Sequence, residues 1–213
     1  MSKQKTTTNF RQSRKSIKTQ DLQSPFFYVL DVGSGDNPHP DATHLCDLHV
    51  NSCTERGGAL RIDGKTFVKC TIDYLPFKDN SFVFDYACHV LEHSYNPALA
   101  LSELTRVSTK GYVETPTKLS ERLYGWSFHK WIISFKNGKF FYEPKGNENV
   151  NRRMHDLYAK NLVVRRLDEI FDYIFSWHYL RVVWKKNAQN ACFEKANLNN
   201  RRRLLSTITS PKF

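Results

Sequence analysis

An apolar segment that runs directly into a glycine turn is the feature that most constrains this chain. The segment, FYVLDVGSGD, spans residues 27 to 36 and brings Asp31 into the turn Gly33-Ser34-Gly35. Glycine at such a turn permits positive φ and lets a ligand approach the backbone closely. The segment therefore predicts a strand that ends at a site for a nucleotide-like ligand.

The residues after the turn indicate which ligand to expect. A dinucleotide-binding fold places a helix N-terminus there to receive a pyrophosphate, and an acid for the ribose follows about twenty residues later. Here Asp36-Asn37-Pro38-His39-Pro40 follows, and Asp47 comes twelve positions after Gly35. Two prolines and so short an interval leave little room for a long helix. We therefore expect a nucleoside without phosphate. S-adenosylmethionine (SAM) is the candidate, because it offers carboxylates a ribose, an adenine and a cationic amino acid.

Three further segments carry a family resemblance. They are TIDYLPFKDNSFVFD (71 to 85), HVLEH (89 to 93) and ELTRV (103 to 107). With the glycine turn, they resemble the class I, type 11 SAM-dependent methyltransferases over roughly residues 27 to 131, with a looser match to 184. The family's D-x-G-x-G-x-G motif aligns with Asp31, Gly33, Gly35 and then Asn37. Asparagine tolerates left-handed backbone, so it can stand where the family has its last glycine.

The resemblance implies a cradle for the cofactor. Gly33 and Gly35, with Ser34 between them, would lie under the cofactor, and Asp31 would sit near its amino-acid end. Asp47, at the end of the strand-like ATHLCD, would accept hydrogen bonds from the ribose hydroxyls.

The resemblance also implies contacts at the adenine and methyl ends. Asp73 would take the adenine amino group, Tyr74 would lie beside the ring, and His89 would lie close to the transferable methyl. A sulfonium is already a strong methyl donor, so alignment and exclusion of water can supply most of the catalysis. A general base helps only where the acceptor must lose a proton. His89 and His129 are the candidates, because imidazole titrates near neutral pH.

Periodicity predicts alternating strands and helices. Strands are expected at 27–32, 43–47, 66–70, 82–88 and 110–114, and a helix at 97–107 that Asn96-Pro97 opens. Downstream, the apolar residues Leu162, Val163, Leu167 and Ile170 predict a helix facing the core, and 171–175 and 179–184 predict two strands. We predict an α/β, Rossmann-like, seven-stranded mixed sheet with a shortened helix after strand 1 and an aromatic-rich insert after strand 5.

The insert spans residues 118 to 151. Its aromatic residues are Tyr124, Trp126, Phe128, Trp131, Phe135, Phe140, Phe141 and Tyr142. Ligands of open α/β sheets bind beyond the carboxyl ends of the strands, so an insert leaving the fifth strand would cover that end. The insert is therefore a candidate substrate lid. The alternative, that these aromatics pack the insert against the sheet, stays open.

Charge is concentrated at the two ends of the chain. Residues 1–24 hold six Lys or Arg and one acid, and residues 185–213 hold seven and one, which leaves 19 of each sign in residues 25–184. We predict a disordered basic tail (1–24), one methyltransferase domain (25–184) and a basic C-terminal tail (185–213). A groove for nucleic acid is expected to be basic on the folded surface, so the neutral core favours a small-molecule or glycan-type acceptor. RNA methylation through the tails and SAM binding without turnover stay as alternatives.

Cysteine use and hydropathy suggest a compartment. The five cysteines form no CxxC pair, which favours reduced thiols and a cytoplasmic protein. Apolar runs stay below about eighteen residues and the first residues lack an apolar signal core, so we expect no membrane span and no secretion. An organelle transit sequence remains an alternative for the acid-free first twenty residues.

Two patterns suggest metal. His89, Glu92 and His93 spell H-x-x-E-H, the signature of inverted zinc proteases, but Asn96-Pro97 ends any helix soon after it. The residues His44, Cys46, His49 and Cys53 also crowd together at spacings that could hold zinc. Because Asp47 lies among the second set with an assigned role, and the first lacks a long helix, we expect no metal ligand in this chain.

Overall fold

The computed structural model describes residues 27–52, 55–146, 156–158, 160–175, 178–187 and 190–196. Its strands are β1 (Val29–Val32), β2 (His44–Asp47), β3 (Thr66–Lys69), β4 (Phe84–Cys88), β5 (Lys110–Pro116), β6 (Trp131–Lys136), β7 (Lys139–Pro144), β8 (Tyr179–Asn187) and β9 (Asn190–Lys195). Its helices are α1 (Pro97–Val107), α2 (Lys118–Tyr124) and α4 (Leu162–Phe175), with a 3-10 turn, η2 (Leu91–His93).

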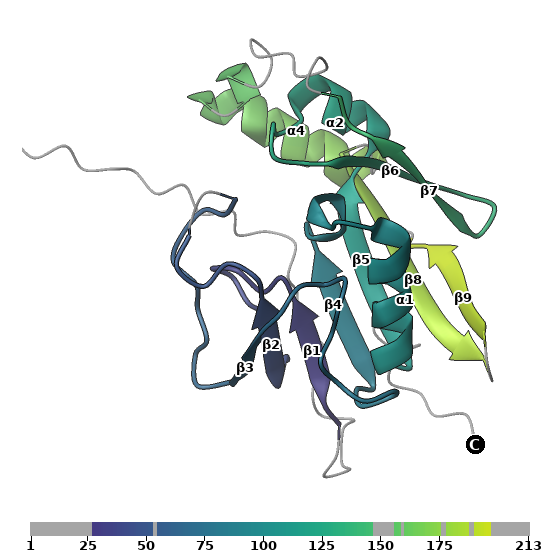
Figure 1. Cartoon of the computed structure of the whole chain (residues 1–213). Helices are drawn as coiled ribbons and strands as arrows, with labels where there is room; N and C mark the ends of the chain where they lie inside the picture. Colours follow the sequence, from purple (N-terminus) through teal and green to yellow (C-terminus); the bar gives the residue numbers. More distant parts are fainter. Residues whose placement is uncertain are drawn as a thin grey trace, which may run out of the picture.

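Seven strands form one mixed sheet in the order β3-β2-β1-β4-β5-β8-β9, and β6 and β7 pair separately. The first five strands of that order run parallel, whereas β8 is antiparallel to β5 and β9 is antiparallel to β8. The carboxyl ends of the parallel strands therefore share one edge, and α2, α4 and the β6–β7 hairpin gather above it (Figure 1). The predicted Rossmann-like seven-stranded sheet is confirmed.

The connections on the β1 side of the sheet are loops. Residues 33–43, between β1 and β2, form turns with no helix, so even the shortened helix predicted there is absent. Pro38 and Pro40 interrupt that segment, and proline lacks the N–H that a helix interior requires. The turns leave the space beyond β1 open to a ligand.

Helix α1 has the predicted bounds because both of its ends are specified locally. The Asn96 side-chain oxygen accepts hydrogen bonds from the backbone N–H groups of Ala98 (3.1 Å) and Leu99 (3.2 Å), and Pro97 occupies the first turn. The residues that α1 buries are Pro97, Ala100, Leu104 and Val107. Ala100, Leu104 and Val107 join the main apolar core, which includes Leu30, Val32, Leu91, Val113, Val182 and Trp184.

Arg106 on α1 holds the loop that precedes β4. Its guanidinium donates hydrogen bonds to the carbonyl oxygens of Phe77 (2.7 Å) and Leu75 (2.8 Å) and to the carboxylate of Glu103 (2.6 Å). Glu103 in turn accepts from the Leu75 N–H at 2.7 Å. The ELTRV and LPF segments therefore form one clamp, because a charged pair satisfies the backbone groups of the loop.

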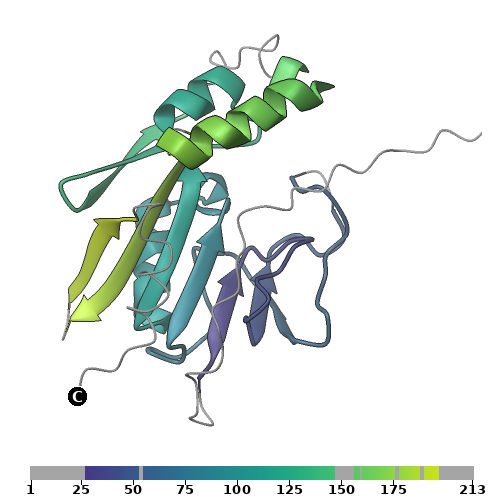
Figure 2. The ribbon, with the colours of Figure 1, turned by 180° about the vertical axis from the view of Figure 1, so that it is seen from behind.

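Three predictions for the C-terminal third are wrong. Residues 171–175 are the last turns of α4 rather than a strand, and the sheet continues through β9 to Lys195, beyond the predicted boundary at 184. The prediction that Leu162, Val163, Leu167 and Ile170 face the core is also wrong, because these side chains are 67%, 67%, 51% and 51% exposed. The buried face of α4 instead carries Asp168 and Asp172. Figure 2 shows α4 lying above the sheet.

The basic tails lie largely outside the described residues, which begin at 27 and end at 196. Three of the C-terminal lysines are exceptions, because Lys185 and Lys186 belong to β8 and Lys195 belongs to β9. Within the described part of the chain, every helix falls short of the length and apolarity that crossing a membrane requires.

Candidate functional site

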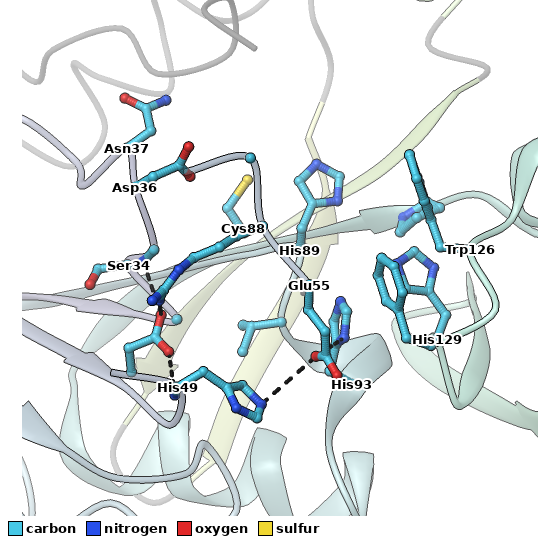
Figure 3. A pocket seen from close by; sticks show the side chains of 18 of the residues that line it. Ser34, Asp36, Asn37, His49, Glu55, Cys88, His89, His93, Trp126 and His129 are labelled. Atoms are coloured by element: carbon cyan, nitrogen blue, oxygen red, sulfur yellow. Dashed lines mark hydrogen bonds and ion pairs between the residues drawn. The ribbon is translucent and has the colours of Figure 1, made fainter. Parts of the chain in front are cut away.

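A cavity of about 1060 Å³ lies beyond the carboxyl ends of the parallel strands. Its lining joins residues that follow five strands to residues of the insert and α4, and Figure 3 shows part of this lining. Among the predicted site residues, those that line the cavity are Gly33, Ser34, Gly35, Asp47, His89 and His129.

The two glycines of the turn serve different purposes. Both have positive φ, 67° at Gly33 and 56° at Gly35. A Cβ atom added to Gly33 would lie 2.7 Å from a methyl carbon of Val90, whereas one added to Gly35 would find its nearest neighbours at 3.9 Å. Gly33 therefore lets the turn pack against the segment after β4, and Gly35 borders open space.

Asp47 lines the cavity at the end of β2. One carboxylate oxygen accepts a 3.0 Å hydrogen bond from the Gly35 N–H, and the other accepts a 2.8 Å bond from the His49 N–H. The guanidinium of Arg56 lies 3.6 Å from the first oxygen. The carboxylate thus fixes the glycine turn while staying at the cavity wall.

Asp31 does not line the cavity. Its side chain is fully buried, and one carboxylate oxygen accepts a 2.6 Å hydrogen bond from the N–H of His39. In this structure Asp31 stabilises the loop after the glycine turn, because its carboxylate oxygen accepts a hydrogen bond from the backbone of that loop.

Asp73 and Tyr74 also lie outside the cavity. The two Asp73 oxygens accept from the N–H groups of Asn96 (2.9 Å) and Tyr95 (3.1 Å), just before α1, and Tyr74 is 69% exposed. The residues that line the cavity here are Thr71 and Ile72. Neither was predicted from the sequence as a site residue. The signal for them was their position just after β3, which resembles the position of Asp47 at the end of β2.

His89 has a left-handed backbone, with φ of 55°, and stands between two buried carboxylates. Its Nδ1 lies 3.4 Å from Glu92 and its Nε2 lies 3.4 Å from Glu114, and its ring meets Tyr179 edge-on. Burial alone would lower the pKa of His89, but Glu114 and Glu92 outweigh burial and raise it to about 9. At neutral pH His89 is therefore a cation that can donate hydrogen bonds, and it is unsuited to act as a general base.

Glu114 is the centre of a buried charge network. It accepts hydrogen bonds from Arg181 Nε, at 2.8 Å, and from the Tyr112 hydroxyl. Arg181 also donates to Asp172 on α4 at 2.7 Å. Burial would raise the pKa of Glu114, but hydrogen bonding to His89 and the charge of Arg181 hold it far below its usual range. The network ties α4 to the sheet beneath the cavity.

A second group of ionisable residues also lines the cavity. His93 Nδ1 lies 3.0 Å from the Glu55 carboxylate, and His129 Nδ1 lies 2.8 Å from that of Glu121. Figure 3 shows His93 and His129 side by side beyond Glu55. Sequence spacing could not reveal either pair, because Glu55 comes from the loop after β2 and Glu121 from α2.

Glu92 lies beside these histidines and is 1% exposed. Burial would raise the pKa of Glu92, but the imidazoles of His89, His129 and His93 outweigh burial and lower it to about 2. The 3.4 Å separation from His89 is long for a hydrogen bond, so we treat that contact as an ion pair.

The H-x-x-E-H segment does not form a zinc-protease helix. Residues 91–93 make a single 3-10 turn, and His89 precedes it with positive φ. His89 and His93 therefore contact different carboxylates, Glu114 and Glu55. For the other candidate set, Cys53 lies outside the described residues.

The aromatic residues of the insert divide between the two interpretations. Tyr124, Trp126 and Phe128 line the cavity, and Phe128 stacks on His93 with ring centroids 5.5 Å apart. The residues that instead pack against the core are Trp131, Phe135, Phe140 and Tyr142. The start of the insert thus covers the cavity, while its hairpin anchors it.

Comparison with known proteins gives a domain match. A family model described as a methyltransferase domain matches residues 30–113, and curated proteins give no match. Three similar solved structures are a complex that contains the Trm112 methyltransferase activator of Haloferax volcanii, and SAM-dependent methyltransferases from Thermotoga maritima and Mesorhizobium loti. Their identities are 12%, 14% and 10%, and their TM-scores 0.43, 0.42 and 0.41. The matches cover 76%, 85% and 75% of this chain and 85%, 81% and 90% of those chains.

Identities and TM-scores this low say nothing about an acceptor or a partner. The domain match agrees with the resemblance carried by the glycine turn and the LPF, HVLEH and ELTRV segments, and it implies SAM as the methyl donor. Residues 30–113 therefore form a methyltransferase domain.

Proposed function

We propose that this enzyme methylates a small-molecule or glycan-type acceptor, which binds between the cofactor and the aromatic start of the insert. The observation that carries this proposal is one cavity of about 1060 Å³ lined by both Gly35 and Trp126. Sites for a single small molecule enclose roughly 300–1,000 Å³, so this volume suits a cofactor together with a small acceptor.

The cofactor would lie along the ends of β1, β2 and β3. Ser34 supports this placement, because its hydroxyl is buried at the cavity wall and has no hydrogen-bond partner among the described residues. In our proposal Asp47 meets the ribose, and Thr71 and Ile72 replace Asp73 and Tyr74 at the adenine. The methyl group would then point toward His89.

Chemistry at this site needs alignment more than acid or base. SAM, when bound, would supply the methyl carbon for in-line attack by a lone pair of the acceptor. The carbon–sulfur bond would break with its electron pair on sulfur, and a proton carried by the acceptor atom would pass to solvent. Trp126 and Phe128 support this role, because a cover of aromatic rings excludes water from the reacting atoms.

The test is binding followed by turnover with the full chain. Calorimetry should show saturable binding of S-adenosylhomocysteine, and incubation with SAM and fractionated small-molecule and glycan extracts should yield S-adenosylhomocysteine. Affinity without turnover on any fraction would instead indicate a SAM-binding protein. Absence of affinity would refute the cofactor site.

The RNA alternative is tested by truncation. Because β9 extends to Lys195, the truncated chain must keep residues 25–196. If the acceptor is small, this chain should turn over as fast as the full chain. RNA methylation that disappears with residues 1–24 and 197–213 would overturn the small-acceptor proposal, since those segments carry much of the excess positive charge.

A further inference from the structure

Three side chains that favour metal ions meet beside the cavity, and two of them, His93 and His129, line it. Ligand atoms of Glu92, His93 and His129 all lie within 4.8 Å of one another. Two of the residues come from η2, and His129 comes from the insert, so the fold brings them together across thirty-six positions of sequence. Two imidazole nitrogens and a carboxylate oxygen are a common donor set for divalent transition metals.

Both histidines are already oriented by carboxylates. Glu55 holds His93 through Nδ1, and Glu121 holds His129 through Nδ1, which leaves Nε2 of each ring as the nitrogen for a ligand bond. Lys145 pairs with the other Glu121 oxygen and fixes that carboxylate. Metal-binding histidines usually donate their second ring N–H to a carboxylate in this way, since the contact sets the tautomer and the ring orientation.

The burial of Glu92 is a second, independent argument for a bound cation. Its side chain is 99% buried, yet neither carboxylate oxygen has a hydrogen-bond partner among the described residues. Its Oε1 lies 3.4 Å from Nδ1 of His89, as an ion pair. A buried carboxylate without hydrogen bonds is costly, and a cation bound to it removes that cost.

We propose that Glu92, His93 and His129 bind a divalent transition-metal ion, with Zn²⁺ as the fitting occupant. Three protein ligands leave at least one position for a ligand from the cavity, because zinc prefers four. The proposal departs from the sequence-based expectation of no metal. It also gives His129 a role as ligand in place of general base.

A neighbouring group shows why this site is preferred. Cys88, His89 and Glu114 also place ligand atoms within 4.8 Å of one another. Glu114, however, already accepts hydrogen bonds from Arg181 and Tyr112, so its charge is compensated by the protein. A metal there would compete with a guanidinium and a hydroxyl for the same carboxylate, whereas neither Glu92 oxygen accepts a hydrogen bond from the described residues.

The experiment is calorimetric titration of Zn²⁺ into the full chain after removal of metal with a chelator. We expect one saturable site in the wild type. Glu92→Gln, a near-isosteric change, should weaken binding by at least about 100-fold, more than the roughly 10- to 100-fold expected when Glu121→Gln removes an orienting partner. His44→Gln is the matched control, because His44 lies on β2 outside the cavity, and it should bind as the wild type does.

Cobalt provides a second readout. Co²⁺ bound to nitrogen and oxygen ligands should give a visible spectrum without a thiolate charge-transfer band, and Glu92→Gln should abolish that spectrum. A thiolate band would point to a cysteine site and overturn the proposal, as would undiminished Zn²⁺ binding in Glu92→Gln or absence of a saturable site in the wild type. S-adenosylhomocysteine affinity of the metal-free chain, measured in parallel, shows separately whether the cofactor site is intact.

Discussion

Arg181 Nε on β8 donates a 2.8 Å hydrogen bond to Glu114 Oε2 on β5, and the same guanidinium reaches Asp172 on α4 at 2.7 Å. Arg181 is 4% exposed and Glu114 fully buried. One cation therefore compensates two buried carboxylates from different elements. Because Leu162, Val163, Leu167, Ile170 and Phe171 of α4 are exposed, this contact is a principal attachment of the helix to the sheet.

We expect Arg181→Met to lower the free energy of unfolding by about 3–5 kcal/mol, because it leaves two buried carboxylates without their cation. Urea denaturation followed by circular dichroism measures the loss. The triple variant Arg181→Met, Glu114→Gln, Asp172→Asn should recover part of it, since the stranded charges are gone. A loss below about 1 kcal/mol for the single variant would show that the network is not required.

The glycine turn gives a matched pair of substitutions. Gly33→Ala should cost about 2–5 kcal/mol of stability, because it combines a left-handed residue with a 2.7 Å clash against Val90. Gly35→Ala has the left-handed residue without the clash and should cost about 1–2 kcal/mol. Chemical denaturation compares the two. Val90→Gly, which removes both the methyl carbon at 2.7 Å and the Cβ at 2.8 Å, should relieve Gly33→Ala but leave Gly35→Ala unchanged. Equal costs would contradict the packing role of Gly33.

Asp85 on β4 predicts a pH-dependent effect. Its carboxyl is fully buried, and burial raises its pKa well above the usual range. The folded state therefore keeps a proton that the unfolded state loses above about pH 4, so this group destabilises the fold as pH rises toward the folded pKa. Relative to the wild type, Asp85→Asn should gain stability as pH rises from 5 to 7, by at most about 1.4 kcal/mol per pH unit.

The measurement is urea unfolding of both chains across that pH range. Asp63→Asn serves as a control, because the Asp63 side chain is exposed. Its stability difference should vary by less than about 0.5 kcal/mol over the same range, since exposed ion pairs contribute little. A flat difference for Asp85→Asn would mean that Asp85 is ionised in the fold.

Asp47 and Asp73 separate a binding role from a structural one. Asp47→Ala should weaken S-adenosylhomocysteine binding by about 1–3 kcal/mol, because a hydrogen-bonding group at the cavity wall is lost. Asp73→Ala should leave the affinity of folded molecules nearly unchanged and instead lower stability by about 1–3 kcal/mol, because it strands the Tyr95 and Asn96 N–H groups. Calorimetry measures the affinity of both variants, and denaturation measures their stability. Equal losses of affinity would show that Asp73 contributes to the cofactor site.

Elements with local signals could be predicted from the sequence. The ends of α1 follow from Asn96-Pro97, and β1, β2 and β4 follow from apolar runs between turn formers. The prediction of a strand at 171–175 is wrong because aromatic and β-branched residues favour strands. The helix α4 is instead attached through Asp168 and Asp172, whose partners His178 and Arg181 lie farther along the chain. No local pattern reveals such pairings.

The site shows the same division. The glycine turn and Asp47 line the cavity, because strand ends position them directly. Asp31 and Asp73 turn toward backbone N–H groups instead, and that choice depends on how the following loops fold. The His93 and His129 pairs depend on Glu55 and Glu121, which only the tertiary fold brings into contact with them.

Strand β3 ends the sheet, with one neighbour and four side chains that all remain at least partly open to solvent. Its amides should take up deuterium sooner than those of β4, whose five residues are all buried. Thr71, just beyond β3, and Asp47, at the end of β2, border the cavity. A cofactor bound to both Thr71 and Asp47 would be released when β3 unfolds locally. Bound cofactor should therefore slow deuterium uptake by the amides of β3. Binding of the methyl donor and local unfolding of β3 would then be thermodynamically linked.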